Sequence, residues 1–296
     1  MKSLWNNRDF GPMLLEEIKE PFDSDDYIFE IKFDGFRALI FASPKEVKIQ
    51  SRNIHDITYL YPELQSIKKM VKENVIFDGE IIVTDAGVPS FSLLQQRSHL
   101  KKKTSIDLAS NNNPVTFIAF DILYENKDLT ELPLVERKKY LNKYHDTEYF
   151  VKSKVIEKNG KELFKTVKKL NLEGIVAKKK DGLYYINSRT DEFIKIKNNN
   201  RDEFYIGGYI EKENTLSILL GEYKDNKLYY VGKVSIGKRQ DTSLKLMKMK
   251  KEKNSFCNLE EEANFVKPSL TCFVEYLERT KSGHLRHPVF KNYSLR

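Results

Sequence analysis

The segment YIFEIKFDGFRALIF, residues 27–41, most constrains what this chain can fold into. Its first half alternates in the way a β-strand does and places Glu30 and Lys32 on one face. Lys32, Asp34 and Arg37 nevertheless interrupt a run that otherwise predicts a buried strand. Because a buried charge without a partner is costly, each of these three groups is expected to have a partner or a chemical task.

Length and composition bound the size of the protein. The chain has 296 residues, which predicts two domains or one large domain. Hydrophobic residues make up 40% and charged residues 32%, as in ordered globular proteins rather than disordered tails. The net charge of +8 permits a polyanionic partner but does not require one.

The cysteines and the N-terminus indicate the compartment. Cys257 and Cys272 show neither a disulfide pattern nor metal-ligand spacing, which favours reduced thiols. The N-terminal MKSLWNNRDF lacks the apolar core of a signal peptide, and no uninterrupted apolar run is long enough to span a bilayer. We therefore expect a cytoplasmic protein that does not bind a membrane.

Periodicity predicts a mixed architecture for the first two thirds of the chain. Strands are predicted over residues 27–42, 45–52, 74–83, 115–124, 173–182 and 191–198. Helices are predicted over 61–74, 90–98, 134–145 and 161–171, and a loop over 105–114. Since strands and helices do not alternate strictly, the predicted class is α+β.

The last third of the chain has a different character. A polar stretch at 198–202 predicts a linker, and a basic helix is predicted further on at 245–253. Strands are predicted over 203–211, 215–223, 227–235 and 272–278. Residues 201–296 carry 18 basic and 13 acidic side chains. A small basic β-domain favours an oligonucleotide-binding barrel, although a solvated face on an ordinary β-domain fits this composition equally well.

The chain has no Walker-type phosphate loop and no dinucleotide fingerprint, so a nucleotide chemistry must use another device. A lysine on a partly buried strand, beside cations or a metal, can lose its proton and become a nucleophile. Lys32 is such a lysine, and Asp34-Gly35 is expected to form a tight bend after it, where glycine supplies the required backbone. Taken alone, Lys-x-Asp-Gly-x-Arg is explained equally well by a strand-edge ion pair.

Five further segments add polar groups in a fixed order. They are SRN at 51–53, DGE at 78–80, FD at 120–121, EGIVAK at 173–178 and KIK at 195–197. Lys195 and Lys197 lie two residues apart on a predicted strand and share a face, which suits two amines that bind one phosphate chain. Glu80 and Glu173 offer hard oxygen ligands for a sugar hydroxyl or Mg²⁺. Phe120 offers a flat surface for a base.

This ordered set resembles the covalent nucleotidyltransferases and, among them, the ATP-dependent DNA ligases, closest to the ligase module of bacterial end-joining (LigD-type) enzymes. The segments typical of that subgroup are SRNIHDITYLYPEL, GVPSFSLLQQR, FYIGGYIE and VEYLERTKSGHLRHPVF. The resemblance runs from Pro12 to the end of the chain. It implies an adenylation (nucleotidyltransferase) domain with mixed and antiparallel sheets at 1–198, followed by an OB-fold DNA-binding barrel at 199–296.

The resemblance also implies roles for individual residues. Lys32 is similar to the nucleophile that takes AMP from ATP, and Lys195 and Lys197 to the lysines that act on the α-phosphate. Further residues are implied in nucleotide binding. Glu30 and Ile31 would contact the adenine edge, and Phe120 would stack under the base. Arg37 and Arg52 would contact ribose and phosphate, and Glu80 would contact the ribose. Metal binding is implied for Glu80 and Glu173, and DNA binding for Arg52 and Arg286.

The implied reaction seals nicks or breaks in duplex DNA through a lysyl-AMP and a DNA-adenylate, with ATP and Mg²⁺ or Mn²⁺ as cofactors. The implied setting is cytoplasmic and nucleoid-associated, in DNA repair, recombination and replication. We expect a monomer that acts on nicked or broken double-stranded DNA, with a Ku-like end-binding protein as a candidate partner. Two alternatives stay open: an RNA ligase or capping-type guanylyltransferase, and a nicked-DNA-binding protein with decayed catalysis.

Overall fold

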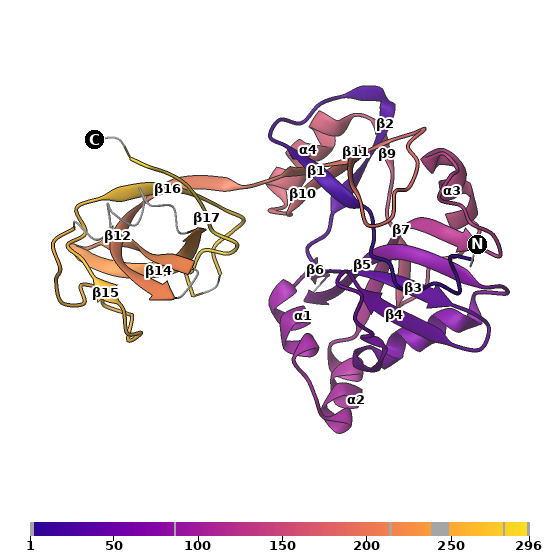
Figure 1. The fold of residues 1–296 in the computed structure, drawn as a ribbon, viewed down its shortest axis with the longest axis horizontal. Coiled ribbons are helices and arrows are strands. Elements are labelled where there is room, and N and C mark those ends of the chain that lie inside the picture. The colour runs from indigo at the N-terminus through magenta and orange to yellow at the C-terminus, as the bar shows by residue number, and fades with distance from the viewer. Residues whose placement is uncertain (1–2, 86, 213–214, 238–248, 281, 295–296) are drawn as a thin grey trace. The chain divides into compact units, whose positions relative to one another are not determined.

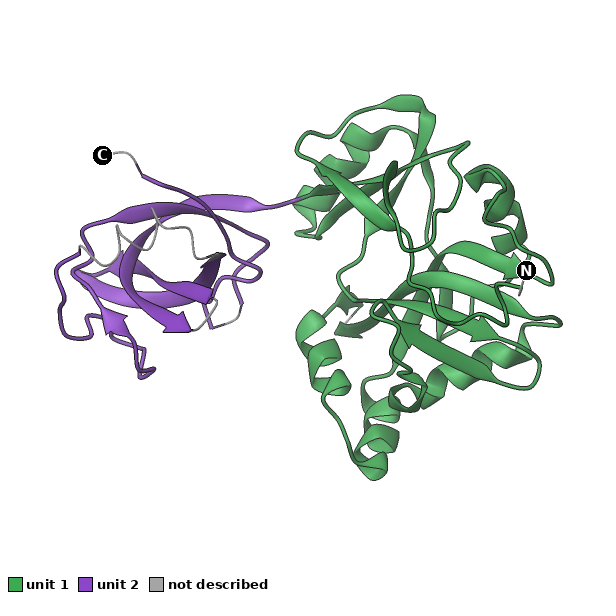
Figure 2. Cartoon of the chain, in the orientation of Figure 1, with its two compact units in different colours: residues 1–197 green, residues 198–296 purple. Residues whose placement is uncertain are grey.

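The computed structural model describes residues 3–85, 87–212, 215–237, 249–280 and 282–294. The chain forms two compact units, Met1–Lys197 and Asn198–Arg296 (Figure 2). Strands occur in both units, whereas the helices of the described residues all lie in the first (Figure 1). The α+β prediction is confirmed. Among the described residues, no helix is both long enough and apolar enough to cross a bilayer.

One sheet of the first unit carries Lys32. Its strand order is β1 (Leu14–Ile18), β11 (Arg189–Lys197), β10 (Gly174–Lys179), β2 (Ser24–Lys32) and β9 (Ile156–Lys158). Phe29 and Ile175 of this sheet pack against Phe164 and Val167 of helix α4 (Gly160–Lys169). Because side chains alternate along a strand, burial of Phe29 under α4 leaves the opposite face of the sheet to its neighbours Glu30 and Lys32.

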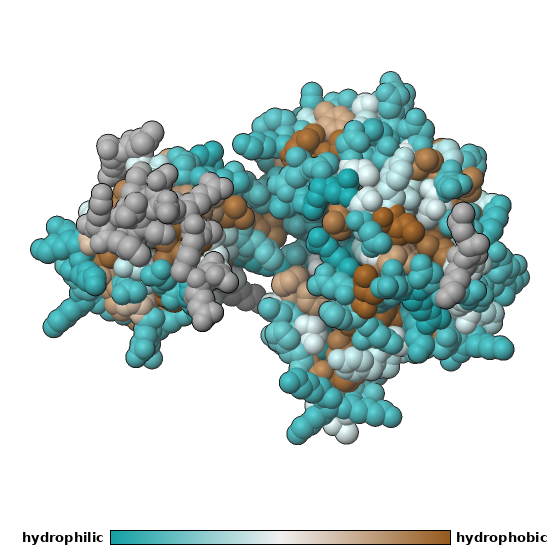
Figure 3. Space-filling model, viewed as in Figure 1, coloured by the Kyte–Doolittle hydropathy of each residue, from teal (hydrophilic) through white to brown (hydrophobic). Residues whose placement is uncertain are grey.

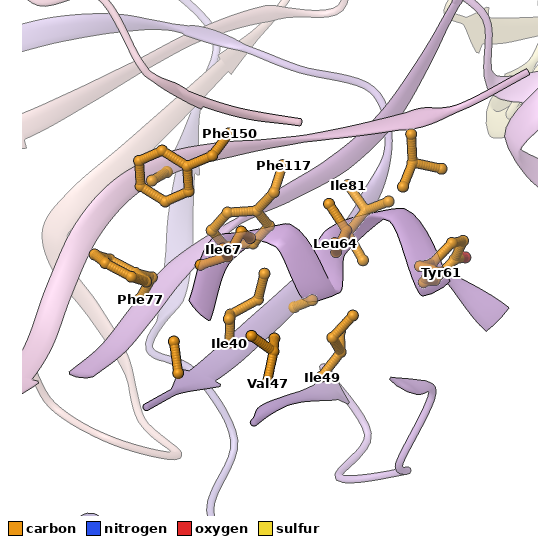
Figure 4. Packing of buried hydrophobic residues seen from close by; sticks show 14 of the residues in the cluster. Ile40, Val47, Ile49, Tyr61, Leu64, Ile67, Phe77, Ile81, Phe117 and Phe150 are labelled. Atoms are coloured by element: carbon orange, nitrogen blue, oxygen red, sulfur yellow. The ribbon is translucent and has the colours of Figure 1, made fainter. Parts of the chain in front are cut away.

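The second sheet of the first unit holds the largest apolar cluster. Its order is β4 (Val47–Ser51), β3 (Phe36–Ala42), β5 (Val75–Asp85), β7 (Val115–Glu125) and β8 (Phe150–Lys152), with β6 (Val88–Pro89) paired to β5. Figure 4 shows Phe77, Phe117 and Phe150 beside Leu64 and Ile67 of the 3₁₀ helix η2 (Pro62–Lys69). Burial of each such phenylalanine contributes about 1.5–3 kcal/mol, so this cluster fixes the frame that carries the polar residues.

Four further helical elements complete the first unit. They are the 3₁₀ turn η1 (Thr58–Leu60), α1 (Phe91–Ser98), α2 (Lys103–Asn112) and α3 (Leu134–Leu141). Helix α3 contacts β7, and α1 contacts β5. These helices therefore cover strands of the second sheet.

The prediction of one continuous strand over 27–42 is wrong, because the segment forms two strands. Strand β2 ends at Lys32 and β3 begins at Phe36, and the two strands belong to different sheets. Gly35 is not among the described glycines with positive φ. A Cβ placed on Gly35 would lie 2.3 Å from the carbonyl oxygen of Ile81. Glycine is thus required here by the close approach of β5, not by the backbone angle that we predicted.

Three other local predictions need correction. Most of the loop predicted at 105–114 belongs to helix α2, because burial of Ile106 in the main core outweighs a composition of Ser and Asn that favours turns. The helix predicted at 61–74 is the shorter 3₁₀ helix η2. Of the basic helix predicted at 245–253, residues 249–253 are not helical and the remainder lies outside the described residues.

The second unit is built from antiparallel strands. They are β12 (Asn200–Lys212), β13 (Thr215–Lys224), β14 (Lys227–Gly237), β15 (Asn264–Phe265), β16 (Thr271–Tyr276) and β17 (Val289–Tyr293). The order β14-β13-β12-β16-β17, with β15 beside β12, is consistent with the predicted OB fold. Arg201 and Asp202 pair with Glu275 and Val274 of β16, so most of the linker predicted at 198–202 is strand.

The surface of both units is largely polar. In the face drawn in Figure 3, hydrophilic residues cover most of the described surface and apolar residues interrupt it in small groups. Scattered apolar residues of this kind are ordinary on folded proteins. The chemistry of the protein must therefore be sought in its cavity and its charged groups.

Candidate active site

The first unit contains a cavity that opens to solvent, with about 420 Å³ of empty space that includes part of that solvent. It is lined by Leu15, Glu30, Ile31, Lys32, Phe33, Arg37, Glu80, Phe120, Val176, Lys178 and Phe193. These residues come from both sheets, so the cavity lies between them. Six of the predicted site residues therefore converge here: Glu30, Ile31, Lys32, Arg37, Glu80 and Phe120.

Lys32 ends β2 at the wall of this cavity. Its amine donates a 2.7 Å hydrogen bond to Oε2 of Glu173, and the two side chains are only 21% and 15% exposed. Burial raises the pKa of Glu173, although the Lys32 charge opposes the rise. The predicted nucleophile thus lies in a partly buried site beside a carboxylate that readily accepts a proton.

Glu80 is the second carboxylate near Lys32. It lies on β5, opposite Arg37 of β3. Burial raises its pKa to about 7, in spite of the positive charges of Lys32 and Arg37 and with a further contribution from Glu173. Two half-buried carboxylates with raised pKa values can accept a hydrogen bond from a hydroxyl or bind a cation. Mg²⁺ is commonly bound by one or two carboxylates together with substrate phosphates. The donor set therefore fits a divalent metal.

Arg37 is held by a partner that the sequence did not reveal. Its Nε and Nη2 donate hydrogen bonds of 2.6 and 2.7 Å to the buried carboxylate of Asp78. The hydroxyl of Tyr184 donates a third bond to Asp78, at 2.7 Å. The guanidinium lies 4.3 Å from the ring centroid of Phe120. Arg37 therefore fixes the Phe120 ring and uses two of its N–H groups inside the protein rather than on a nucleotide.

Glu30 is also more constrained than predicted. Its Oε1 accepts a hydrogen bond from Lys138 of α3, and its Oε2 accepts one from Lys178 at 2.8 Å. The Lys178 amine lies 4.4 Å from the centroid of the Phe120 ring and 5.0 Å from that of Phe193. Burial lowers the pKa of Lys178 to about 8, although Glu30 opposes the change. Glu30, which we predicted to contact the adenine edge, therefore has Lys178 bonded to it in the cavity lining.

Ile31 does not present its side chain to the cavity. It packs with the cluster under α4, on the other face of β2 from Glu30 and Lys32. Any contact of Ile31 with a base must therefore come from its backbone. This outcome follows from the strand alternation that the sequence already showed.

The two lysines of β11 lie on the sheet face that carries the cavity. Through the intervening strand β10, Lys195 aligns with Glu30 and Lys197 aligns with Lys32. The residue between Lys197 and Lys32 is Gly174, which has no side chain to fill the gap. Neighbouring strands lie about 4.8 Å apart, so the backbones of Lys32 and Lys197 are roughly 10 Å apart across β10. This separation is wide enough for a phosphate between the two side chains.

Neither Lys195 nor Lys197 lines the cavity itself. Their amines instead lie 3.2 and 3.1 Å from the same oxygen of Glu17 on β1. The two lysines predicted to bind phosphate are therefore paired within the protein by a carboxylate, Glu17, that the sequence did not indicate.

Neither of the predicted DNA-binding arginines is among the residues that line the cavity. Arg52 has an exposed side chain in the turn after β4, and its backbone N–H donates to the carbonyl of Arg37 at 3.1 Å. Arg286 belongs to the second unit, where its Nη1 donates to Oε1 of Glu278 at 2.8 Å. The two arginines thus lie in different units.

Comparison with known protein families gives two matches. The family described as "ATP dependent DNA ligase domain" matches residues 12–197. The family described as "ATP dependent DNA ligase C terminal region" matches residues 211–295. The two matched ranges fall in the two compact units.

Individual relatives agree with these matches. The chain is 31% identical over 288 residues to the SPbeta prophage-derived DNA ligase-like protein LigB of Bacillus subtilis, with 96% of this chain and 98% of LigB covered. It is 31% identical over 311 residues to the multifunctional non-homologous end joining protein LigD of Mycolicibacterium smegmatis. That alignment covers 98% of this chain but only 39% of LigD. A solved structure of mycobacterial DNA ligase D complexed with ATP and MES is similar at a TM-score of 0.60 and 28% identity, covering 97% of this chain and 95% of that one.

Proposed function

The chain belongs to the ATP-dependent DNA ligase family, and from this premise we propose that Lys32 is the residue that becomes covalently bonded to AMP. The resemblance drawn from the motifs is confirmed, and the RNA-ligase, guanylyltransferase and non-enzymatic alternatives are not favoured. The protein is a DNA ligase that uses ATP and acts on DNA. What remains to be proposed is which residues perform the reaction.

The observation that carries the assignment of Lys32 is its place at the cavity wall, 2.7 Å from Glu173. In the first step Nζ of Lys32 attacks the α-phosphorus of ATP, an N–P bond forms, and the bond to the pyrophosphate oxygen breaks. Glu173 is positioned to hold the proton that the amine loses, and burial has already raised its pKa. AMP then passes to the 5′-phosphate of the nick, and attack by the 3′-hydroxyl releases it.

The other predicted residues supply binding. Phe120 lies on β7 and presents its ring to the cavity, where a base can stack, and Glu80 lies where a ribose hydroxyl or a metal can be bound. Lys195 and Lys197 lie on the same sheet face as Lys32 and are assigned to the α-phosphate. Glu80 and Glu173 would hold Mg²⁺ or Mn²⁺, which offsets charge on the phosphates when bound.

We assign DNA binding to Arg52, Arg286 and the second unit, with the first unit as the adenylation domain. The substrate we propose is nicked or broken duplex DNA, sealed by a monomer in the cytoplasm. Relatives named for end joining support an end-binding protein of the Ku type as a partner, but they are much longer than this chain. Their other activities are not assigned to it.

The assignment of Lys32 is tested by intact-protein mass spectrometry after incubation with ATP and Mg²⁺. We expect the mass of one AMP to be added to the wild-type protein, and the adduct to be lost in acid as a phosphoramide is. Lys32→Ala should abolish the adduct. Lys179→Ala is the matched control, because Lys179 lies on β10 in the same sheet and does not line the cavity.

Two results would contradict the assignment. An adduct that persists in Lys32→Ala would move the nucleophile to another residue. A wild-type protein that gains no adduct with either Mg²⁺ or Mn²⁺ would show that this chain does not perform the first step.

A further inference from the structure

Glu17 pairs with both of the lysines that we assign to the α-phosphate. It lies on the edge strand β1, opposite Lys195 of β11. A single oxygen, Oε2, lies 3.2 Å from the amine of Lys195 and 3.1 Å from that of Lys197. One negatively charged oxygen between two ammonium groups is the arrangement that a phosphate oxygen would form with the same lysines.

We propose that Glu17 takes the place of a nucleotide phosphate between Lys195 and Lys197 in the free enzyme and is displaced when a nucleotide binds. This inference depends on the proposed function, since it takes both lysines as phosphate ligands. Glu17 is then a positioning residue that competes with substrate and product. It touches neither the reacting nitrogen nor the reacting phosphorus.

The exposure of Glu17 suits a contact that must be broken in every catalytic cycle. Its side chain is 45% exposed, whereas those of Lys195 and Lys197 are 21% and 31% exposed. Ion pairs of half-exposed groups are weak. The triphosphate chain of ATP and the monoester phosphate of AMP each carry more negative charge than one carboxylate, so the exchange favours the nucleotide. The two lysines lower the pKa of Glu17 in spite of its partial burial, so Glu17 stays ionised at neutral pH and the competition persists there.

The same contact has a consequence for the product. AMP leaves at the end of the reaction, and Glu17 then re-forms its pairs with both lysines. A carboxylate that weakens the binding of ATP therefore also weakens the binding of AMP. Removing its charge should tighten both without raising the rate of turnover.

Isothermal titration of the full chain with AMP tests this proposal. We expect Glu17→Gln to lower the Kd for AMP about threefold to tenfold at low salt, with a smaller gain at high salt. Glu16→Gln is the matched control, because Glu16 pairs with Ile194, whose side chain packs on the α4 side of the sheet. In ligation assays Glu17→Gln should lower KM for ATP and leave kcat unchanged or reduced.

A background that lacks both lysines separates the two proposals. If Lys195→Met with Lys197→Met leaves AMP affinity unchanged, the assignment of the lysines to the phosphate is wrong. If that double variant weakens AMP binding but Glu17→Gln binds AMP no more tightly than the wild type, the inference about Glu17 is overturned. The inference is supported if Glu17→Gln tightens binding in the wild-type background and has no effect in the double variant.

Discussion

Replacing Glu80 by glutamine should make the first unit less sensitive to pH between about 4.5 and 8. Burial raises the pKa of Glu80 from the ordinary 4.5 to about 7. Between these two values the folded protein holds a proton that the unfolded chain has released, so the free energy of unfolding falls as the pH rises. The stability that depends on this proton is complete below pH 4.5 and is lost as the pH passes through 7.

The magnitude follows from the two pKa values. The difference between 4.5 and about 7 corresponds to about 3.4 kcal/mol, at about 1.36 kcal/mol for each pH unit. The Glu80 side chain borders a cavity open to solvent, and water there reduces the cost of its charge. We therefore expect the wild type to lose about 1.5–2.5 kcal/mol more than Glu80→Gln between pH 5 and pH 8.

The single tryptophan makes the measurement specific to the first unit. Trp5 packs against Phe41 and Tyr124, with ring centroids 6.2 Å away in each case. Its fluorescence during urea unfolding therefore reports residues 1–197. The titration is run at several pH values from 5 to 8, without nucleotide or metal, so that only the free carboxyl is compared.

A control separates this effect from general charge effects. Glu131→Gln changes an exposed glutamate of the same unit and should follow the wild type at every pH. Titration of the groups that do not interact with Glu80 cancels in the difference between the wild type and Glu80→Gln. A difference that stays constant from pH 5 to pH 8 would refute the view that Glu80 is protonated in the folded protein at mildly acidic pH.

Two further substitutions test the frame around the site by the same urea unfolding. Ile54→Gly should raise the free energy of unfolding by about 1 kcal/mol. Ile54 is β-branched and has a φ of 65°, which glycine adopts without strain. An unchanged or lower free energy of unfolding would count against that strain. Asp121→Asn should lower it by about 3–5 kcal/mol, because Arg137, fully buried, makes two 2.9 Å hydrogen bonds to Asp121 and would keep an uncompensated charge. A loss below 1 kcal/mol would show that this ion pair is not important for stability.

Much of the fold could be predicted because periodicity identifies buried faces. The alternation at 27–32 placed Lys32 and Glu30 opposite the side that α4 covers, and the structure shows the same arrangement. Periodicity could not show that the chain changes sheets after Lys32, since a side-chain pattern names a face and not its partner. Helix α2 was missed because its single buried residue, Ile106, gives too little apolar signal.

The sequence predicted which residues form the site more fully than it predicted which side chains pair with one another. Six motif residues line the cavity, because motifs keep residue types at fixed places along the chain. The partners of Glu30 depend on the register between strands and on the placement of α3, which no local pattern encodes. Lys178 ends the segment EGIVAK at 173–178 that the sequence had already singled out, but its bond to Glu30 depends on the pairing of β10 with β2. Lys138 carries no comparable signal.

The pairing of three lysines on one sheet face with carboxylates explains how this region of the protein tolerates its cations without a nucleotide. Lys32 is paired with Glu173, and Lys195 and Lys197 are paired with Glu17. Three amines on one sheet face would repel one another, and each carboxylate offsets that repulsion in the free protein. A bound triphosphate brings its own negative charge, so the carboxylates are no longer needed to balance the amines. Because linkage is reciprocal, a substitution that weakens the hold of Glu17 on Lys195 and Lys197 must strengthen the binding of phosphate to those lysines, unless the same substitution also displaces their amines.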